Sequence, residues 1–310
     1  MRILITGVYG FLGYSTAVRL LKAGHIVYGV DKVKEAISPK AARIQNLAKF
    51  QGFHFHDINL ANFGQVQTLF DVLEFDHLIH YAAQYSVIHK TEHVLSYVDS
   101  NLRAFMHVIE AAKLKGLKRL VYASSTFVQD GQLPTSMYGA TKEFNERAAH
   151  IYSSQFGMET VGLRFGSVYG PYQRADTGIY YLARRLYAGQ PVDMTKGGFK
   201  YQVAFLYVAD AVESAIRFLG APLPQLYNVH TVVAEDRFAD LGELLELMER
   251  CSGKTAVRHG EYQRVAARIV PTEACERLRA VIGHAPRTTL EEGMEKFCAW
   301  FGPRFDQGKV

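Results

Sequence analysis

A tyrosine and a lysine lie four positions apart in the segment TSMYGATKEF, which runs from Thr135 to Phe144. Only small residues separate Tyr138 from Lys142, and residues four apart are neighbours on one face of a helix. An ammonium held beside a phenol favours the phenolate and lowers the pKa of the phenol. The pair could therefore form a general base at neutral pH. The alternative for an isolated pair is an exposed aromatic beside a solvated lysine.

Three glycines, Gly7, Gly10 and Gly13, follow the first predicted strand in the segment TGVYGFLG. The first allows a tight turn, the second lets the backbone approach a pyrophosphate, and the third lets the helix pack close to the strand. Amide groups at the helix start, around Phe11 and Leu12, then face the phosphates. Because the motif lies between a predicted strand and a predicted helix, it favours a dinucleotide cofactor over an ordinary turn.

Two acidic residues end predicted strands near this turn. Asp31 lies about eighteen residues beyond Gly13, close to the spacing of an acid that binds the adenosine ribose. Such a carboxylate accepts from both ribose hydroxyls and repels a 2′-phosphate, which favours NAD over NADP, although Lys32 weakens that preference. Asp57, followed by Ile58, could meet the adenine or cap the next helix. Asp31 could also simply end its strand.

Short apolar stretches alternate with longer amphipathic ones through the first half of the chain. Strands separated by helices imply βαβ units and a parallel sheet covered on both faces. The expected fold is an α/β Rossmann fold with a doubly wound parallel sheet. The predicted strands are 2–6, 25–30, 53–56, 77–81, 119–123 and 160–165, and the predicted helices are 11–23, 62–74, 93–115 and 136–156.

The regular alternation of predicted strands and helices ends after about residue 165. The segment 166–178 is rich in glycine, aromatic and polar residues and is predicted to be a loop. Helices are predicted at 178–188, 208–219, 236–251 and 289–301, with a short strand at 225–230. We expect an NAD-binding domain over 1–165 that carries the candidate base, and a smaller, mainly substrate-binding α/β region over 166–310 at the carboxyl edge of the sheet.

Bulk properties exclude several classes of protein. The chain has 310 residues, of which 48% are hydrophobic and 21% charged, as in ordinary globular proteins. The formal charge of +5 is spread without a Lys/Arg block, so a nucleic-acid partner is not expected. Cys251, Cys275 and Cys298 form no metal-binding pattern, so we expect no metal and a reducing, cytoplasmic location. No signal peptide or membrane-spanning stretch is visible.

Taken together, the motifs resemble the extended short-chain dehydrogenase/reductase family, in particular its NAD-dependent nucleotide-sugar epimerases, dehydratases and decarboxylases. The resemblance covers nearly the whole chain. Within that family, four segments look most like UDP-glucuronate 4-epimerases: HYAAQYSV, YVDSNLRAFMHVIEAA, MYGATK and LRFGSVYGPYQRAD.

The resemblance implies a role for each matching residue. Tyr138 would be the catalytic base, Lys142 would hold the nicotinamide ribose and lower the pKa of the tyrosine, and Ser125 would orient the substrate. Helices 93–115 and 136–156 would form the four-helix interface of a homodimer. Residues expected to line the cofactor cleft are Tyr81, Ala82, Ala83, Asn101 and Phe165.

Two positions after the catalytic hydroxyl separate the possible reactions. Sugar-nucleotide 4,6-dehydratases carry an Asp-Glu pair there, whereas this chain has Thr126 and Phe127. Phenylalanine cannot transfer a proton, so dehydration is not expected. Arg174 is the candidate that binds a uronate carboxylate, because a guanidinium binds carboxylates bidentately, although a solvated loop arginine is the alternative. The other residues predicted to bind substrate are Gln84, Ser86, Thr126, Ser167 and Arg268.

Three differences from the family leave the substrate open. Only twelve residues separate Ser125 from Tyr138, and VQD (128–130) replaces the usual Val-Tyr-Gly. Val203 stands where relatives carry an arginine for the nucleotide diphosphate; Lys200, Arg264 or, preferably, Arg268 could replace it. We therefore expect an NAD-dependent 4-epimerase of the UDP-glucuronate/UDP-galacturonate type acting through a transient 4-keto sugar. The alternatives are a nucleotide-sugar dehydrogenase or decarboxylase with net oxidation, and a non-catalytic NAD-binding protein.

Overall fold

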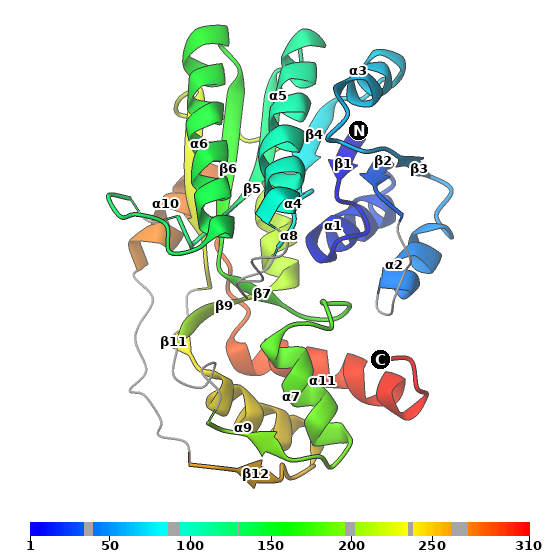
Figure 1. The fold of residues 1–310 in the computed structure, drawn as a ribbon, viewed down its shortest axis with the longest axis vertical. Helices are drawn as coiled ribbons and strands as arrows, with labels where there is room; N and C mark the ends of the chain where they lie inside the picture. Colours follow the sequence, from blue (N-terminus) through cyan, green and yellow to red (C-terminus); the bar gives the residue numbers. More distant parts are fainter. Residues whose placement is uncertain (34–39, 86–93, 129, 196–201, 235–237, 262–271) are drawn as a thin grey trace.

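A computed structural model of the chain describes residues 1–33, 40–85, 94–128, 130–195, 202–234, 238–261 and 272–310. A seven-stranded sheet with helices on both faces occupies the upper part of the view in Figure 1, and a smaller unit built around α7, α9 and α11 lies below it. Among the described residues, no helix has the length and apolar character needed to cross a bilayer.

The seven strands pair in the order β10-β6-β5-β4-β1-β2-β3, and every pairing is parallel. The strand order reverses between β1 and β4, and ligands of open α/β sheets bind outside the carboxyl ends of strands at such a point. The sequence prediction of a doubly wound parallel sheet is confirmed. The strands are β1 (Arg2–Thr6), β2 (Ile26–Asp31), β3 (Phe53–Asp57), β4 (His77–His80), β5 (Arg119–Ser125), β6 (Glu159–Phe165) and β10 (Tyr227–Val232).

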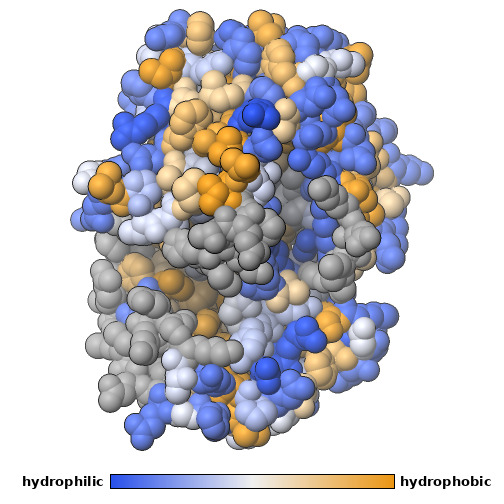
Figure 2. All heavy atoms as spheres, in the orientation of Figure 1, coloured by the Kyte–Doolittle hydropathy of each residue, from blue (hydrophilic) through white to orange (hydrophobic). Residues whose placement is uncertain are grey.

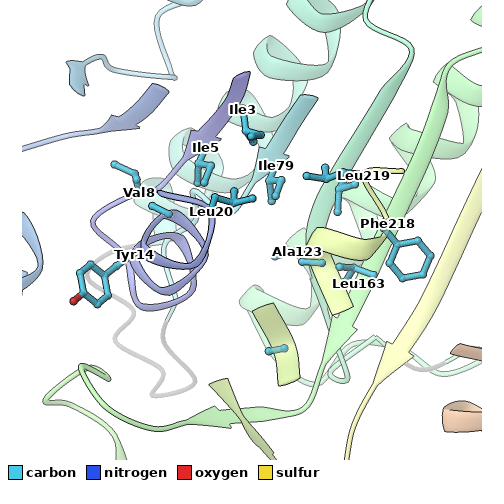
Figure 3. Close-up of a cluster of buried hydrophobic side chains, with 14 of the residues drawn as sticks. Ile3, Ile5, Val8, Tyr14, Leu20, Ile79, Ala123, Leu163, Phe218 and Leu219 are labelled. Atoms are coloured by element: carbon cyan, nitrogen blue, oxygen red, sulfur yellow. The ribbon is translucent and has the colours of Figure 1, made fainter. Parts of the chain in front are cut away.

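Alternation along β1 builds the core on both faces of the sheet. Ile3 and Ile5 pack with Leu20 of α1 (Phe11–Lys22), as Figure 3 shows, whereas Leu4 belongs to the cluster on the opposite face. This period of two follows from the pleat of a strand. Helices α1 and α8 (Val208–Arg217) cover one face, and α3 (Phe63–Val72), α5 (Ala104–Leu114) and α6 (Met137–Phe156) cover the other.

The second half of the chain contributes to both units. Strand β10 joins the main sheet beside β6, and α8 packs against α1. Elements beyond residue 165 therefore complete the first unit. The division of the chain at residue 165 stays a prediction. Helix α10 (Thr272–Ile282) packs against β10 of the main sheet. The remaining elements form the smaller unit and its border: β7 (Ser167–Tyr169), α7 (Gly178–Tyr187), β8 (Val192–Asp193), β9 (Val203–Tyr207), β11 (Phe238–Ala239), α9 (Leu241–Ser252), β12 (Arg258–His259) and α11 (Leu290–Asp306).

Several elements differ from the sequence predictions. The helix predicted at 93–115 is divided into α4 (Val94–Tyr97), a π-helical turn η2 (Val98–Arg103) and α5. Sequence reasoning missed α2 (Lys40–Leu47), whose sequence KAARIQNL is only eight residues long and polar on average, and it also missed α10, β7 and β9. The helix predicted from residue 236 begins at Leu241, because Phe238–Ala239 pairs with β9 as strand β11.

Candidate active site

The glycine-rich turn after β1 lies against the segment that follows β4. Gly7 has a φ of 70°, and a Cβ added there would lie 2.7 Å from the backbone nitrogen of Ala82. A Cβ on Gly13 would lie 2.2 Å from the carbonyl oxygen of Gly7. Both contacts are too short for any side chain, so the close approach of turn, helix and strand depends on glycine. This cradle fits a dinucleotide pyrophosphate at the start of α1.

Asp31 and Asp57 lie side by side where β2 and β3 end, since the register of the two strands pairs them. The Asp31 carboxylate accepts from the backbone N–H groups of Tyr9, at 2.9 Å, and of Lys32, at 2.8 Å. Lys40 Nζ lies 3.3 Å from Asp31 Oδ1. A carboxylate offers about four acceptor positions, so Asp31 keeps capacity for a ribose hydroxyl. Ile58 directly follows Asp57, and its N–H donates to the carbonyl of Asp31 at 3.4 Å.

The segment 81–84 is fixed from two sides. The Tyr81 hydroxyl accepts from Thr16 at 3.2 Å, and the Ala82 N–H donates to the hydroxyl of Thr6 at 3.3 Å. Asn101, in the π-helical turn, binds both backbone groups of Gln84, at 2.7 and 3.0 Å. Because the side-chain amide of Asn101 is occupied in this way, we interpret Asn101 as a residue that holds the segment 81–84 in place. Ala83 lies in the same segment.

Tyr138, Ser125 and Lys142 converge at the carboxyl end of β5. Ser136 caps α6 by accepting from the N–H of Gly139 at 3.0 Å, which places Tyr138 in the first turn of the helix. Lys142 lies one turn later, 1% exposed, and its Nζ donates to the carbonyl of Ala123 at 2.8 Å. The Nζ atom is 5.7 Å from the centroid of the Tyr138 ring. The sequence spacing thus produces the shared helix face that it predicted.

Electrostatics at this centre are dominated by burial. Burial raises the pKa of the Tyr138 hydroxyl, and Tyr85 raises it further, whereas a hydrogen bond with Ser125 and the charge of Arg174 lower it. Burial also lowers the pKa of Lys142 to about 8, against an opposing effect of Glu146. In the protein alone, burial therefore outweighs any lowering of the Tyr138 pKa by Lys142.

The short loop between Ser125 and Tyr138 is tied back to the sheet. Arg164 on β6 donates to Glu146 through two nitrogens, at 2.8 and 2.7 Å, and to Asp130 in the loop at 2.8 Å. Glu146 is buried one turn beyond Lys142. A buried ion pair of this kind fixes geometry because separating it leaves an uncompensated charge. The buried pair fixes Arg164 between β6 and α6, and the loop is attached to Arg164 through Asp130, whose side chain is 87% exposed.

Arg174 reaches the same centre through Tyr85, a residue that sequence reasoning did not select. The guanidinium lies 5.2 Å from the centroid of the Tyr85 ring and donates to its carbonyl at 3.2 Å. Tyr85 in turn packs edge-on against Tyr138, with centroids 4.9 Å apart. Arg174 also forms a two-pronged ion pair with Asp176, with its Nε 2.9 Å from Oδ1. The guanidinium is thus near the candidate base and already paired with one carboxylate.

Phe127 packs against Tyr138 from another side, with centroids 6.3 Å apart in an edge-to-face arrangement. The position that holds a carboxylate in dehydratases therefore carries an apolar wall. No signal in a single sequence distinguishes such a contact from an exposed aromatic, so the roles of Tyr85 and Phe127 required the tertiary structure. Thr126 donates its hydroxyl to the carbonyl of Phe165 at 3.3 Å, which places both residues beside Ser125.

The positions of the other residues predicted to bind substrate do not assign them a role. Ser167 is exposed at the start of β7, and Val203, in the position of the missing arginine, begins β9. The candidate replacements for that arginine, together with Ser86, lie outside the described residues; they are Lys200, Arg264 and Arg268. Within the described part of the chain, no group of three or more His, Cys, Asp or Glu residues is arranged to hold a metal ion.

The parallel sheet, the glycine cradle at its switch point and the buried Tyr138–Lys142 pair define a Rossmann-fold enzyme of the extended short-chain dehydrogenase/reductase type. Comparison with known families agrees. The chain belongs to the NAD dependent epimerase/dehydratase family, whose model matches residues 3–229. NAD is accordingly its cofactor, and the residues around the glycine turn and Asp31 fit that cofactor.

Relatives extend this similarity over the whole chain. The chain is 30% identical to Protein CapI of Staphylococcus aureus, over 97% of this chain and 98% of that protein. It is 29% identical to a UDP-glucuronate 4-epimerase of Thermodesulfobacterium geofontis, over 96% and 95%. Among solved structures, a UDP-glucuronic acid 4-epimerase of Bacillus cereus, crystallised with UDP-glucuronic acid and NAD, matches with a TM-score of 0.81 and 25% identity. That match covers 98% of this chain and 99% of the other.

Proposed function

We propose that this protein is an NAD-dependent nucleotide-sugar 4-epimerase of the UDP-glucuronate/UDP-galacturonate type. The observation that carries the proposal is the juxtaposition of Tyr138, Ser125 and Lys142 with Arg174, joined through the ring of Tyr85. A base beside a guanidinium suits a sugar that has both an oxidisable hydroxyl and a carboxylate. Similarity to UDP-glucuronate 4-epimerases over nearly the full length supports the same substrate class.

The chemistry assigns one task to each residue. Tyr138 takes the proton of the C4 hydroxyl and later returns it to the same oxygen. Ser125, hydrogen-bonded to Tyr138, donates to that oxygen as it becomes a carbonyl. Lys142 holds the ribose of the cofactor and contributes its charge to the site. NAD bound at the glycine turn would supply a reversible hydride acceptor for C4. A 4-keto sugar that turns over between the two transfers leaves with C4 inverted.

The ion pair of Arg174 with Asp176 bears on the sugar. A guanidinium has five N–H donors, and the contacts of Arg174 with Asp176 and the Tyr85 carbonyl use its Nε and Nη2 atoms, so Nη1 keeps donors for a second carboxylate. We infer that the uronate carboxylate binds the Nη1 side of Arg174, beside Asp176. Phe127 beside Tyr138 supplies no proton, so the site does not favour loss of water.

A second copy of the chain is the proposed partner. Figure 2 shows apolar side chains on the face over α4 and α6. The exposed apolar residues of these two helices include Leu95 of α4, which is 79% exposed, and Phe144 and Ile151 of α6. Phe144 and Ile151 are seven positions apart and therefore share one face of α6. A homodimer that packs this face would remove it from water.

Three free cysteines suit a cytoplasmic location.

Three measurements test the proposal. Incubation of the purified protein with a panel of nucleotide sugars, UDP-glucuronate first, followed by NMR of the products, should give the C4 epimer. The absorbance of NADH should stay constant, because an epimerase consumes no net oxidant. Steady accumulation of NADH or release of carbon dioxide would instead identify a dehydrogenase or decarboxylase. Sedimentation analysis of the native chain and of Phe144→Glu should give a dimer and a monomer, respectively.

A further inference from the structure

A strained residue lies in the loop that carries Arg174. Tyr172, between β7 and α7, has a φ of 66°, and it is the only described residue other than glycine with a positive φ. Bulky side chains rarely adopt this left-handed conformation, which persists only where the surroundings impose it. Arg174 follows two positions later. The contacts that fix the backbone of Tyr172 therefore also position the backbone from which the Arg174 side chain extends.

Side chains from both units hold Tyr172. Asn46 of α2 and Arg304 of α11 both donate to its hydroxyl, each at 3.1 Å. Its ring packs against Tyr14 of α1 and Trp300 of α11, with centroids 5.0 and 5.1 Å apart. The side chain is therefore anchored between the first two helices and the last helix of the chain.

The backbone of Tyr172 is held by a buried cation. Arg43 of α2 is 4% exposed, and its Nη1 donates to the carbonyl of Tyr172 at 2.7 Å. Its Nε donates to the carbonyl of Tyr9 at 2.8 Å, and the N–H of Tyr9 donates to Asp31. One planar guanidinium thus bridges the glycine-rich turn and the loop of Arg174. A buried charge is retained where its hydrogen bonds compensate for lost solvation.

We propose that Arg43 is a positioning residue that ties the Arg174 loop to the cofactor-binding turn. It touches neither the reacting atoms nor the sugar. It acts by imposing the strained conformation of Tyr172, so that Arg174 meets the sugar in fixed relation to Tyr138. The part of this inference that concerns the sugar rests on the proposed function. The part that concerns the loop does not.

Limited proteolysis tests the loop directly. Trypsin cleavage after Arg174 yields a fragment of residues 1–174 that mass spectrometry identifies without any substrate. Arg43→Met should speed the appearance of this fragment about tenfold, because a charge-assisted hydrogen bond no longer closes the loop. Arg19→Met is the matched control: Arg19 also lies on a helix of the cofactor side but is 57% exposed in its side chain, and its cleavage rate should stay native.

Kinetics test the consequence for the sugar. In Arg43→Met with its NAD content verified, the KM for UDP-glucuronate should rise about tenfold while kcat changes less than about threefold, since positioning of the sugar is lost but the base is kept. Affinity for UDP, which lacks the glucuronate group that Arg174 would contact, should be unchanged. An equal loss of affinity for UDP and UDP-glucuronate would overturn the positioning role.

If Arg43→Met does not fold, Tyr172→Phe decides. That substitution removes the hydrogen bonds of the Tyr172 hydroxyl, among them those with Asn46 and Arg304, and should give a smaller acceleration of cleavage, about threefold. A native cleavage rate after Arg174 in every folded variant would overturn the proposal. Failure of the native chain to convert any nucleotide sugar would refute the proposed function alone, because the proteolysis comparison needs no turnover.

Discussion

Replacing Tyr138 by phenylalanine separates chemistry from structure at the proposed centre. The ring of Tyr138 is 8% exposed and packs against Tyr85 and Phe127, and phenylalanine retains both contacts. Only the hydroxyl is lost, together with its hydrogen bond to Ser125. Loss of one buried hydrogen bond costs about 0.5–1.5 kcal/mol of stability. The variant should therefore fold and keep its NAD.

The effect on turnover should be far larger. A positioned general base contributes about 10²–10⁴-fold to rate, which corresponds to about 3–5 kcal/mol of the activation barrier. We expect kcat for UDP-glucuronate to fall by that factor, while NAD released from the purified variant matches the native amount. Product formation by NMR, NAD content and thermal unfolding provide the three measurements.

Tyr152→Phe is the matched control. Tyr152 lies on the same helix, is also 8% exposed, and donates its hydroxyl to Glu110 at 2.7 Å. The two variants should lose comparable stability, but only Tyr138→Phe should lose turnover. A Tyr138→Phe protein that keeps kcat within about tenfold of native would refute the assignment of the base. So would an equal loss of activity in the control.

Three further substitutions probe the site. Arg174→Lys keeps the charge but loses the planar fork, so kcat/KM for UDP-glucuronate should fall about 10–100-fold while that for a neutral UDP-hexose changes little; equal losses would exclude a carboxylate contact. The free energy of unfolding in urea, compared between the native chain and Lys142→Met, should differ by an amount that depends on pH. The unfolded state binds the Lys142 proton above the folded pKa of about 8, so native stability relative to the variant should rise between about pH 8 and 10.5, by on the order of 3 kcal/mol; a flat or falling difference would contradict the burial of this ammonium. Gly13→Ala places a Cβ 2.2 Å from the carbonyl oxygen of Gly7 and should cost about 1–3 kcal/mol and most of the bound NAD, whereas Gly220→Ala, where a Cβ meets nothing within 4 Å, should cost neither.

The local features of the site could be predicted from the sequence. The spacing of Tyr138 and Lys142 fixes a shared helix face, because the geometry of a helix is the same in any protein. The glycine turn behaves similarly, since Gly7 and Gly13 occupy positions where the backbone contacts leave no room for a Cβ. The doubly wound parallel sheet was predictable from the alternation of strands and helices, whereas the order of its strands came from the structure.

Features that depend on long-range packing were not predictable in this way. The helix α2 carries Arg43 but has too few apolar residues to be recognised by periodicity. The sequence predicted that Lys142 lowers the pKa of Tyr138, whereas burial raises that pKa in the folded protein without its cofactor. Burial depends on neighbours such as Tyr85, which lies 53 positions before Tyr138 in the chain.

The sequence by itself determined which residues can do the chemistry, because periodicity, glycine spacing and the Tyr138–Lys142 interval are local properties of the chain. Only the tertiary structure decided their environment. It placed Tyr85 between Tyr138 and Arg174, paired Arg174 with Asp176, and brought Arg43 to the carbonyl of Tyr172, 129 positions away. The physical reason is that burial and hydrogen-bond partners arise from packing between distant segments, which a local pattern does not encode.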